Sequence, residues 1–244
     1  MDMKINTLGL TCALLLSTPA MAAPHWGYEG AEGPDHWAKL SPDFVACAGQ
    51  NQSPVNIEGT VEATLTLPQA NYQPGGASMI NNGHTLQVDY AAGSTLLIDK
   101  QPFTLKQFHF HAPSENQIRG QSYPLEAHLV HANDKGELAV LAVMFEEGEA
   151  NPLLTDAWHH LPLATGQRIA LKSALDAGQL LQPRLDVYRF NGSLTTPPCS
   201  EGVRWLVLKQ PMTASAEQIA AFKALLHHPN NRPVQPIHAR QILE

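Results

Sequence analysis

The sequence has few charged residues, few aromatic residues and only three cysteines, and it contains no internal repeat, charge block or Gly/Ser-rich linker. Charged residues make up 15% of the 244 residues, and 22 acidic residues against 15 Lys and Arg give a net charge of −7. A surface of that sign repels phosphate backbones and anionic lipids, which argues against nucleic acid and membrane surfaces as partners. Because no linker divides the chain, we expect one continuous domain over residues 23–244.

Proline and glycine are plentiful, with 19 and 17 residues that are too scattered for a collagen-like repeat and too many for a helical bundle. Short alternating or wholly apolar runs recur between them, and such runs predict strands. The expected strands cover residues 64–67, 85–88, 95–98, 108–111, 127–130, 138–145 and 203–208.

Two helices are expected on the outside of the sheet. Ser215 and Gln218 have the spacing of a capping box ahead of a periodic apolar segment, and Asn151-Pro152 offers an N-cap followed by proline at the first helical position. Strands and helices together predict a mainly β fold with peripheral helices (α+β). We expect a single domain built on a large, mostly antiparallel twisted central sheet.

The first 22 residues resemble an export signal. Lys4 precedes an apolar stretch over residues 8–16, and Ala20-Met21-Ala22 forms a cleavage pattern, which together predict a secretory signal peptide. The stretch is too short to span a bilayer. The alternative is a disordered or buried N-terminus. We therefore expect removal of residues 1–22 and a periplasmic or secreted protein.

Removal of that segment also removes Cys12 and leaves Cys47 and Cys199. An even number of cysteines in an oxidising compartment is compatible with a disulfide. Two free buried thiols are the alternative that the residues alone leave open.

Two neighbouring histidines share one face of an expected strand. In Gln107-Phe108-His109-Phe110-His111, alternation sends His109 and His111 to the same side. The run at 126–131 could lie beside it in a meander and add His128 or His131; parity favours His128, although spacing alone does not decide. Three neutral imidazoles with an open fourth position form a catalytic zinc site.

Zinc-binding histidines also need partners that fix their orientation. Gln107 and Glu126 each stand two positions before a candidate ligand, on the same face of its strand. For Glu126, an ordinary exposed strand carboxylate is the alternative interpretation.

These residues belong to seven ordered blocks through which the chain resembles the α-class carbonic anhydrases, in particular the exported bacterial type. The resemblance covers almost the whole mature length. The blocks are His25-Trp26-Gly27-Tyr28, Gln52-Ser53-Pro54-Val55-Asn56-Ile57, Asn82-Gly83-His84, Gln107-Phe108-His109-Phe110-His111, Glu126-Ala127-His128-Leu129-Val130-His131, Ser193-Leu194-Thr195-Thr196-Pro197-Pro198 and Asn231-Arg232-Pro233-Val234-Gln235-Pro236.

The resemblance implies a role for each matched polar residue. It matches His109, His111 and His128 to the zinc ligands and leaves His131 outside, and it assigns Gln107 and Glu126 to orient the ligands. It further implies that Thr195 accepts the proton of zinc-bound hydroxide and donates its own to Glu115, and that His84 shuttles protons to buffer. Without it, the threonine would belong to a rigid Pro-rich turn and His84 to an ordinary turn.

An apolar pocket for carbon dioxide is implied as well, since the substrate carries no charge. Its matched residues are Val130, Val140, Leu194, Thr196, Val203 and Trp205; plain core packing is the alternative for the apolar ones. The family also pairs Cys47 with Cys199, and its members commonly have cis bonds at positions that match Ser53-Pro54 and Pro197-Pro198.

The sequence thus predicts a zinc lyase that interconverts carbon dioxide with bicarbonate and a proton by zinc-hydroxide attack. One alternative is a non-catalytic zinc-binding relative on the same scaffold. Another is a zinc-dependent esterase, as a side activity of the same site. The expected partner is the small-molecule substrate; a homodimer is compatible with the resemblance, although no sequence patch indicates an interface.

Overall fold

The computed structural model describes residues 24–244. The predicted signal peptide, with Cys12, lies outside the described residues. Over residues 24–244, every helix is too short or too polar to cross a bilayer.

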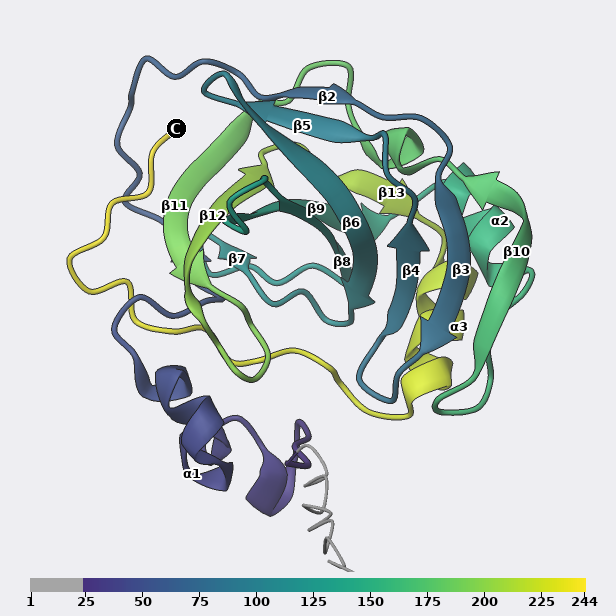
Figure 1. Ribbon diagram of the computed structural model, residues 1–244, viewed down its shortest axis with the longest axis horizontal. Helices are drawn as coiled ribbons and strands as arrows, with labels where there is room; N and C mark the ends of the chain where they lie inside the picture. Colours follow the sequence, from purple (N-terminus) through teal and green to yellow (C-terminus); the bar gives the residue numbers. More distant parts are fainter. Residues whose placement is uncertain (1–23) are drawn as a thin grey trace, which may run out of the picture.

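Over residues 24–244, eleven strands form one curved mixed sheet, and β1 and β7 pair separately in parallel (Figure 1). The long path through the sheet runs β10-β3-β4-β6-β8-β9-β12-β11, with β5 beside β6, β2 beside β5 and β13 beside β9. The strands are β1 (Asn56–Ile57), β2 (Gln69–Asn71), β3 (Gly76–Asn81), β4 (Leu86–Tyr90), β5 (Thr95–Ile98), β6 (Gln101–His111), β7 (Gln117–Ile118), β8 (Leu125–Ala132), β9 (Leu138–Glu147), β10 (Arg168–Leu175), β11 (Val187–Ser193), β12 (Glu201–Leu208) and β13 (Met212–Ala214).

The predicted fold class is confirmed. Most neighbouring strands are antiparallel, as expected, and the sheet is mixed because β12 and β13 both pair with β9 in parallel. The predicted meander is also present, since β6 and β8 are antiparallel neighbours.

The helices of residues 24–244 are α1 (Trp37–Leu40), α2 (Pro152–Trp158) and α3 (Ala216–Leu226), with 3-10 turns at η1 (Gly30–Glu32), η2 (Pro42–Ala48) and η3 (Ala177–Leu180). Two of them, α2 and α3, pack against one face of the sheet near β10, β3 and β4, and α1 lies in the N-terminal segment (Figure 1). Both predicted helix starts are confirmed: Ser215 and Gln218 form a capping box for α3, and the Asn151 side chain accepts the backbone N–H groups of Leu153 and Leu154. The apolar faces of α2 and α3 join the main core.

Each face of the central strands has its own apolar cluster. Phe108, Phe110, Leu129 and Leu141 belong to the main core, which α2 and α3 cover. The opposite face carries a second cluster, which includes Val140 and the aromatic rings of β11 and β12. The alternation of β6 and β8 therefore separates the packing side chains from the histidine face.

One predicted strand is wrong. Residues 64–67 alternate Thr and Leu, but they form no strand, and both leucines are only partly buried. Just before this segment, Val61 instead forms a parallel β-bridge with Leu243 in the C-terminal segment. Alternation without a partner strand does not produce a ladder. Several strands were not predicted, among them β3, β10 and β11.

Candidate metal centre and active site

Three histidines meet on the second-cluster face of the sheet. His109 and His111 alternate along β6, and His128 on β8 is the direct register partner of His109. One nitrogen from each ring lies within 4.8 Å of the others. His131 points to the opposite face, where its Nε2 lies 2.5 Å from the Tyr72 hydroxyl. The structure therefore brings together the residues that parity favoured.

Two of the imidazoles have a hydrogen-bond partner on the nitrogen that turns away from the cluster, and the third, His128, has a carboxylate beside that nitrogen. Nδ1 of His109 lies 2.8 Å from Oε1 of Gln107, and Nδ1 of His111 lies 2.7 Å from the backbone carbonyl of Asn230. Because both partners only accept, these nitrogens carry the hydrogens and the two Nε2 atoms keep their lone pairs. For His128, Nε2 lies 3.0 Å from Oε1 of Glu126, so Nδ1 faces the cluster.

Burial keeps the three rings neutral. Desolvation lowers the pKa of His109, His111 and His128, and charge repulsion among the rings contributes to the lowering at His109 and His128. Neutral imidazole is the form that binds a metal ion. Nε2 of His111 is buried and has no hydrogen-bond partner in the described chain. Three neutral nitrogen donors and an unsatisfied buried atom fit a zinc ion.

Glu126 is not an ordinary exposed carboxylate, because it is fully buried. Its Oε2 accepts the backbone N–H groups of Glu115 and Asn116 at 2.6 and 3.0 Å, and its Oε1 accepts the Asn116 side-chain amide at 2.8 Å. Burial raises the pKa of Glu126, while these hydrogen bonds and His111 oppose the rise. The carboxylate is thereby fixed against His128.

Glu115 is a second buried carboxylate at the cluster. Oε1 accepts the backbone N–H of Arg232 at 2.8 Å, and Oε2 lies 3.4 Å from Nε2 of His111. Burial raises the pKa of Glu115, whereas Arg232 and the nearby Thr195 hydroxyl lower it. Thr195 itself is buried, and it precedes a turn in which the backbone N–H of Cys199 donates to the carbonyl of Thr196 at 2.8 Å.

Three of the predicted apolar pocket residues, Val130, Val140 and Trp205, lie in one register row with Gln107. Gln107, Val130, Val140 and Trp205 are successive register partners across β6, β8, β9 and β12. The Trp205 ring lies 4.9 Å from the ring of His128. Together with Leu194 and Val203, the apolar residues of this row belong to the second cluster, in which Val130 and Leu194 are partly exposed. Thr196 is also partly exposed but is not part of that cluster.

His84 follows β3 in a tight turn that Asn82 stabilises by accepting the His84 backbone N–H at 2.9 Å. Gly83 has φ +86°, and a Cβ there would meet the Thr165 side chain at 2.9 Å. The His84 ring stacks on Trp26 with centroids 3.7 Å apart and planes at 8°. Burial lowers its pKa, and His25 and His228 lower it further. His84 thus lies in an aromatic cluster rather than free on the surface.

Asn230 and Arg232 are functional residues that sequence reasoning missed. Asn230 supplies the carbonyl that orients His111, and its side chain binds backbone atoms of Ala112, Phe110 and His84. No periodic or motif signal distinguishes Asn230. Arg232 stands in a matched block, but a fully buried arginine is uncommon and nothing in the sequence indicates its partners.

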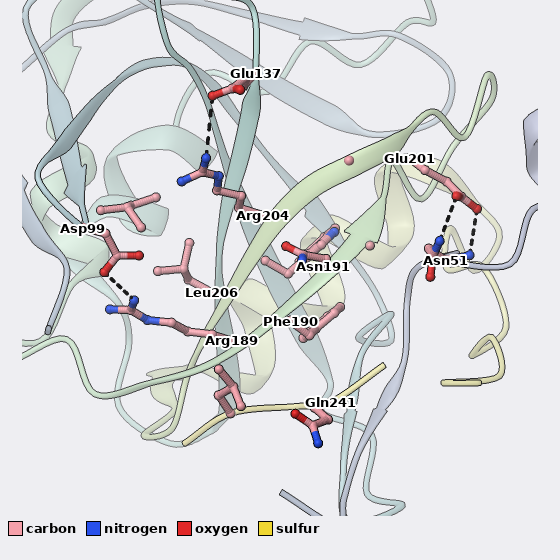
Figure 2. A pocket seen from close by; sticks show the side chains of 15 residues that line it. Asn51, Asp99, Glu137, Arg189, Phe190, Asn191, Glu201, Arg204, Leu206 and Gln241 are labelled. Carbon is pink, nitrogen blue, oxygen red and sulfur yellow. Dashed lines mark hydrogen bonds and ion pairs between the residues drawn. The ribbon is translucent and has the colours of Figure 1, made fainter. Parts of the chain in front are cut away.

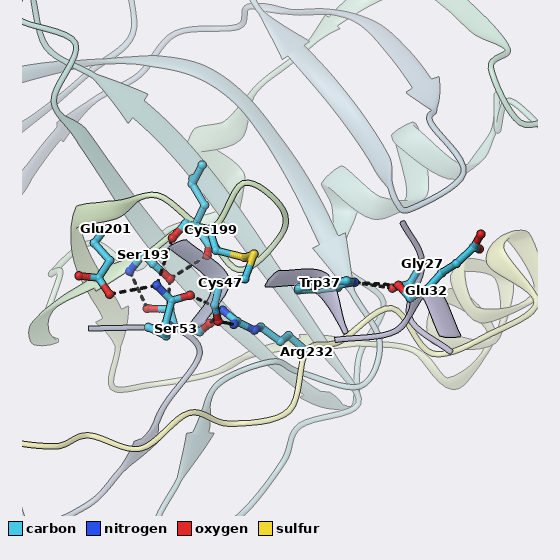
Figure 3. Close-up of a disulfide and its surroundings, with 11 residues drawn as sticks. Gly27, Glu32, Trp37, Cys47, Ser53, Ser193, Cys199, Glu201 and Arg232 are labelled. Atoms are coloured by element: carbon cyan, nitrogen blue, oxygen red, sulfur yellow. Dashed lines mark hydrogen bonds between the residues drawn. A yellow bond between two sulfur atoms is a disulfide. The ribbon is translucent and has the colours of Figure 1, made fainter. Parts of the chain in front are cut away.

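The predicted disulfide between Cys47 and Cys199 is present and joins two cysteines that are 152 residues apart in the sequence (Figure 3). The Arg232 guanidinium donates to the carbonyl oxygens of Cys47 and Ser53 at 2.9 and 2.8 Å, and Gln52 donates to the carbonyl of Cys199 at 3.1 Å. The bonds at Ser53-Pro54 and Pro197-Pro198 are cis, as expected, and so is Ala112-Pro113. The bridge therefore joins the N-terminal segment to the turn after Thr195.

An open pocket of about 600 Å³ lies over β11 and β12 (Figure 2). Its two arginines are both held by carboxylates: Arg189 by Asp99 at 3.0 Å and Arg204 by Glu137 at 3.7 Å. Trp205 alone among the predicted site residues lines it. The pocket does not share the polar residues of the histidine cluster.

Comparison with known proteins gives consistent matches. The family model described as eukaryotic-type carbonic anhydrase matches residues 32–244. A carbonic anhydrase from Pectobacterium carotovorum is 51% identical over 238 residues, which cover 97% of this chain and 98% of that protein. A hyperthermostable carbonic anhydrase from a hydrothermal vent chimney superimposes with TM-score 0.88 at 51% identity, covering 90% of this chain and 99% of that one. The sulfanilamide complex of an α-carbonic anhydrase from Thermovibrio ammonificans gives TM-score 0.89 at 44% identity, covering 91% and 100%.

Proposed function

The chain belongs to the family of eukaryotic-type carbonic anhydrases and converts carbon dioxide reversibly to bicarbonate and a proton. On this basis we propose a role in the reaction for each residue of the site. The observation that supports the assignment is the convergence of three neutral imidazole nitrogens beside a buried glutamate and threonine. The family is zinc-dependent, and we propose that His109, His111 and His128 hold the ion. When bound, zinc supplies the Lewis acidity that makes water a nucleophile at neutral pH.

Gln107, Glu126 and the Asn230 carbonyl fix the three rings before any ion binds. Each of these groups lies beside the ring nitrogen that turns away from the cluster, so the other nitrogen of each ring faces the cluster. This arrangement reduces the reorganisation that metal binding requires.

Thr195 and Glu115 orient the nucleophile. A cation held by the neighbouring histidines favours the ionised form of Glu115. The Thr195 hydroxyl then donates to that carboxylate, and its own oxygen accepts a hydrogen bond from the attacking group. This fixed hydrogen-bond direction turns the reactive lone pair toward the substrate. The apolar side chains of Val130, Leu194 and Trp205 contact the substrate and offer it no hydrogen bonds.

His84 carries the product proton to buffer. Its lowered pKa leaves the imidazole neutral at pH 7, the form that accepts a proton. Stacking on Trp26 holds the ring in one orientation.

We also propose that residues 1–22 are a signal peptide and that the mature protein, residues 23–244, acts in the periplasm or outside the cell. The disulfide supports an oxidising compartment. Fractionation of the expressing cells, with N-terminal sequencing of the mature protein, tests this proposal; intact residues 1–22 on active cytoplasmic enzyme would contradict it.

Stopped-flow hydration of carbon dioxide by mature protein, with bound zinc counted, tests the assignment beside a His109→Ala variant. We expect rapid hydration with about one zinc per chain, and loss of both in the variant. Stoichiometric zinc without hydration would favour a non-catalytic zinc-binding relative. Hydrolysis of an activated ester in the same samples shows whether the site has an esterase side activity.

A further inference from the structure

A second histidine lies beside the predicted shuttle. His228 follows α3 and is partly buried, and its ring centroid lies 6.1 Å from that of Tyr28. The Tyr28 ring in turn lies 6.4 Å from the ring of His84. The two histidines therefore flank one tyrosine.

Tyr28 packs between aromatic rings of the N-terminal segment and the two histidines. Its hydroxyl is buried and has no hydrogen-bond partner in residues 24–244. Burial raises the Tyr28 pKa, and the charge of Glu115 raises it further. Tyr28 thus links the ring of His228 to the ring of His84.

Asn230 holds the two histidines in a fixed relation. Its side-chain amide donates to the backbone carbonyl of His84 at 3.0 Å, and its own carbonyl accepts the Nδ1 hydrogen of His111 at 2.7 Å. Only Pro229 separates Asn230 from His228. The backbone that carries His228 is therefore tied both to His84 and to the metal centre.

The chemistry of His228 suits proton transfer. Its Nδ1 lies 2.9 Å from the carbonyl of Pro229, so Nδ1 carries the hydrogen and Nε2 keeps a free lone pair. His25 is another histidine of the N-terminal segment, but its Nδ1 lies 3.0 Å from Oε2 of Glu32 and is engaged by that carboxylate. His228 has no such partner among the described residues.

We propose that His228 is a second proton-transfer residue of this enzyme, accepting on Nε2 the proton that hydration releases and passing it to buffer in parallel with His84. In each cycle, carbon dioxide and water give bicarbonate and a proton; Nε2 of His228 takes up the proton, and a buffer base then removes it. Nothing is oxidised or reduced. The proposal rests on the carbon dioxide hydration of the preceding section.

The test compares His84→Ala, His228→Ala and the double variant with a matched control, His227→Ala, whose side chain is adjacent and exposed. Hydration is measured by stopped flow in weak and in concentrated imidazole-type buffer. In weak buffer we expect kcat of His228→Ala to be about twofold below that of the unmodified enzyme. We expect kcat of the double variant to be about tenfold or more below that of the unmodified enzyme, and lower than kcat of His84→Ala. Concentrated buffer should restore kcat in these variants, and their kcat/KM for carbon dioxide should stay unchanged. The His227→Ala variant should match the unmodified enzyme in both parameters.

A double variant no slower than His84→Ala in weak buffer would overturn the proposal. A fall in kcat/KM for His228→Ala, or a loss that concentrated buffer does not restore, would also overturn it, because both results indicate a structural role. Absence of hydration by the zinc-loaded unmodified enzyme would instead refute the proposed function, and this proposal with it.

Discussion

His109 and His128 are direct register partners across β6 and β8, with ring centroids 5.3 Å apart. The pairing directs both rings toward His111, whereas His131, also on β8, lies on the other face and contacts Tyr72. The sheet register therefore selects one of two histidines that are only three residues apart.

His128→Ala should abolish zinc binding although His131 remains, because a side chain on the opposite face cannot replace the lost nitrogen. Loss of a residue that only orients a ligand lowers metal affinity by about 10- to 100-fold, and we expect a larger fall when the ligand itself is removed. Zinc is counted after dialysis, with exposed His159→Ala as control. Retention of one zinc per chain by His128→Ala would disprove the proposed ligand set.

Gln107→Ala should weaken zinc binding without abolishing it. The variant removes the acceptor that fixes Nδ1 of His109, and such losses lower metal affinity by about 10- to 100-fold. Competition with a chelator measures the affinity, and Gln101→Ala, an exposed glutamine on the same strand, is the matched control. Equal affinities in the two variants would mean that Gln107 does not orient the ligand.

Thr195→Val should keep zinc and lose turnover. The substitution preserves the shape of the side chain but removes the hydroxyl near Glu115, so the nucleophile is no longer oriented. We expect kcat/KM for carbon dioxide to fall by about 100-fold, with zinc content unchanged. Full activity in this variant would exclude the hydroxyl from the mechanism.

The pH dependence of kcat in weak buffer should report His84. Because burial lowers its pKa below 6.5, the ring is neutral at pH 7 and becomes protonated, and unable to accept a proton, only as the pH falls through that lowered pKa. We therefore expect kcat to decline with a midpoint below pH 6.5. His84→Ala should lower kcat in weak buffer, with rescue by added imidazole; an unchanged rate would remove His84 from the mechanism.

Replacing Cys47 and Cys199 with alanine should destabilise the fold and slow the enzyme. A bridge across 152 residues contributes about 5 kcal/mol to the free energy of unfolding in the chain-entropy model. Denaturant unfolding measures this loss. Hydration at moderate temperature tests whether the turn after Thr195 also depends on the bridge, and full activity there would show that it does not.

Most of the fold could be predicted because its strands and helices carry local signals. The alternation in β6 and β8 and the capping box at Ser215 depend on neighbouring residues alone. The strand β10 was missed because it is mostly exposed, and β11 because Arg189, Asn191 and Gly192 interrupt its apolar pattern. Residues 64–67 have the pattern of a strand but lack a partner, which no local signal could indicate.

The same distinction applies to the site. His109 and His111 share a face by alternation, whereas the choice of His128 required the register of β8 against β6. The roles of Asn230 and Arg232 come from contacts across more than a hundred residues of sequence. Such contacts leave no periodic trace, so only the folded chain reveals them.

The sequence separation between Asn230 or Arg232 and the groups they hold has a consequence for the order of assembly. All three histidines and Glu115 come at least a hundred residues earlier in the sequence, yet the carbonyl that orients His111 and the N–H that holds Glu115 are supplied by residues 230–232. A nascent or prematurely terminated chain would therefore carry every metal donor while its site stayed unfinished. Formation of the sheet therefore does not complete the site by itself, because the segment that contains Asn230 and Arg232 must also dock against it.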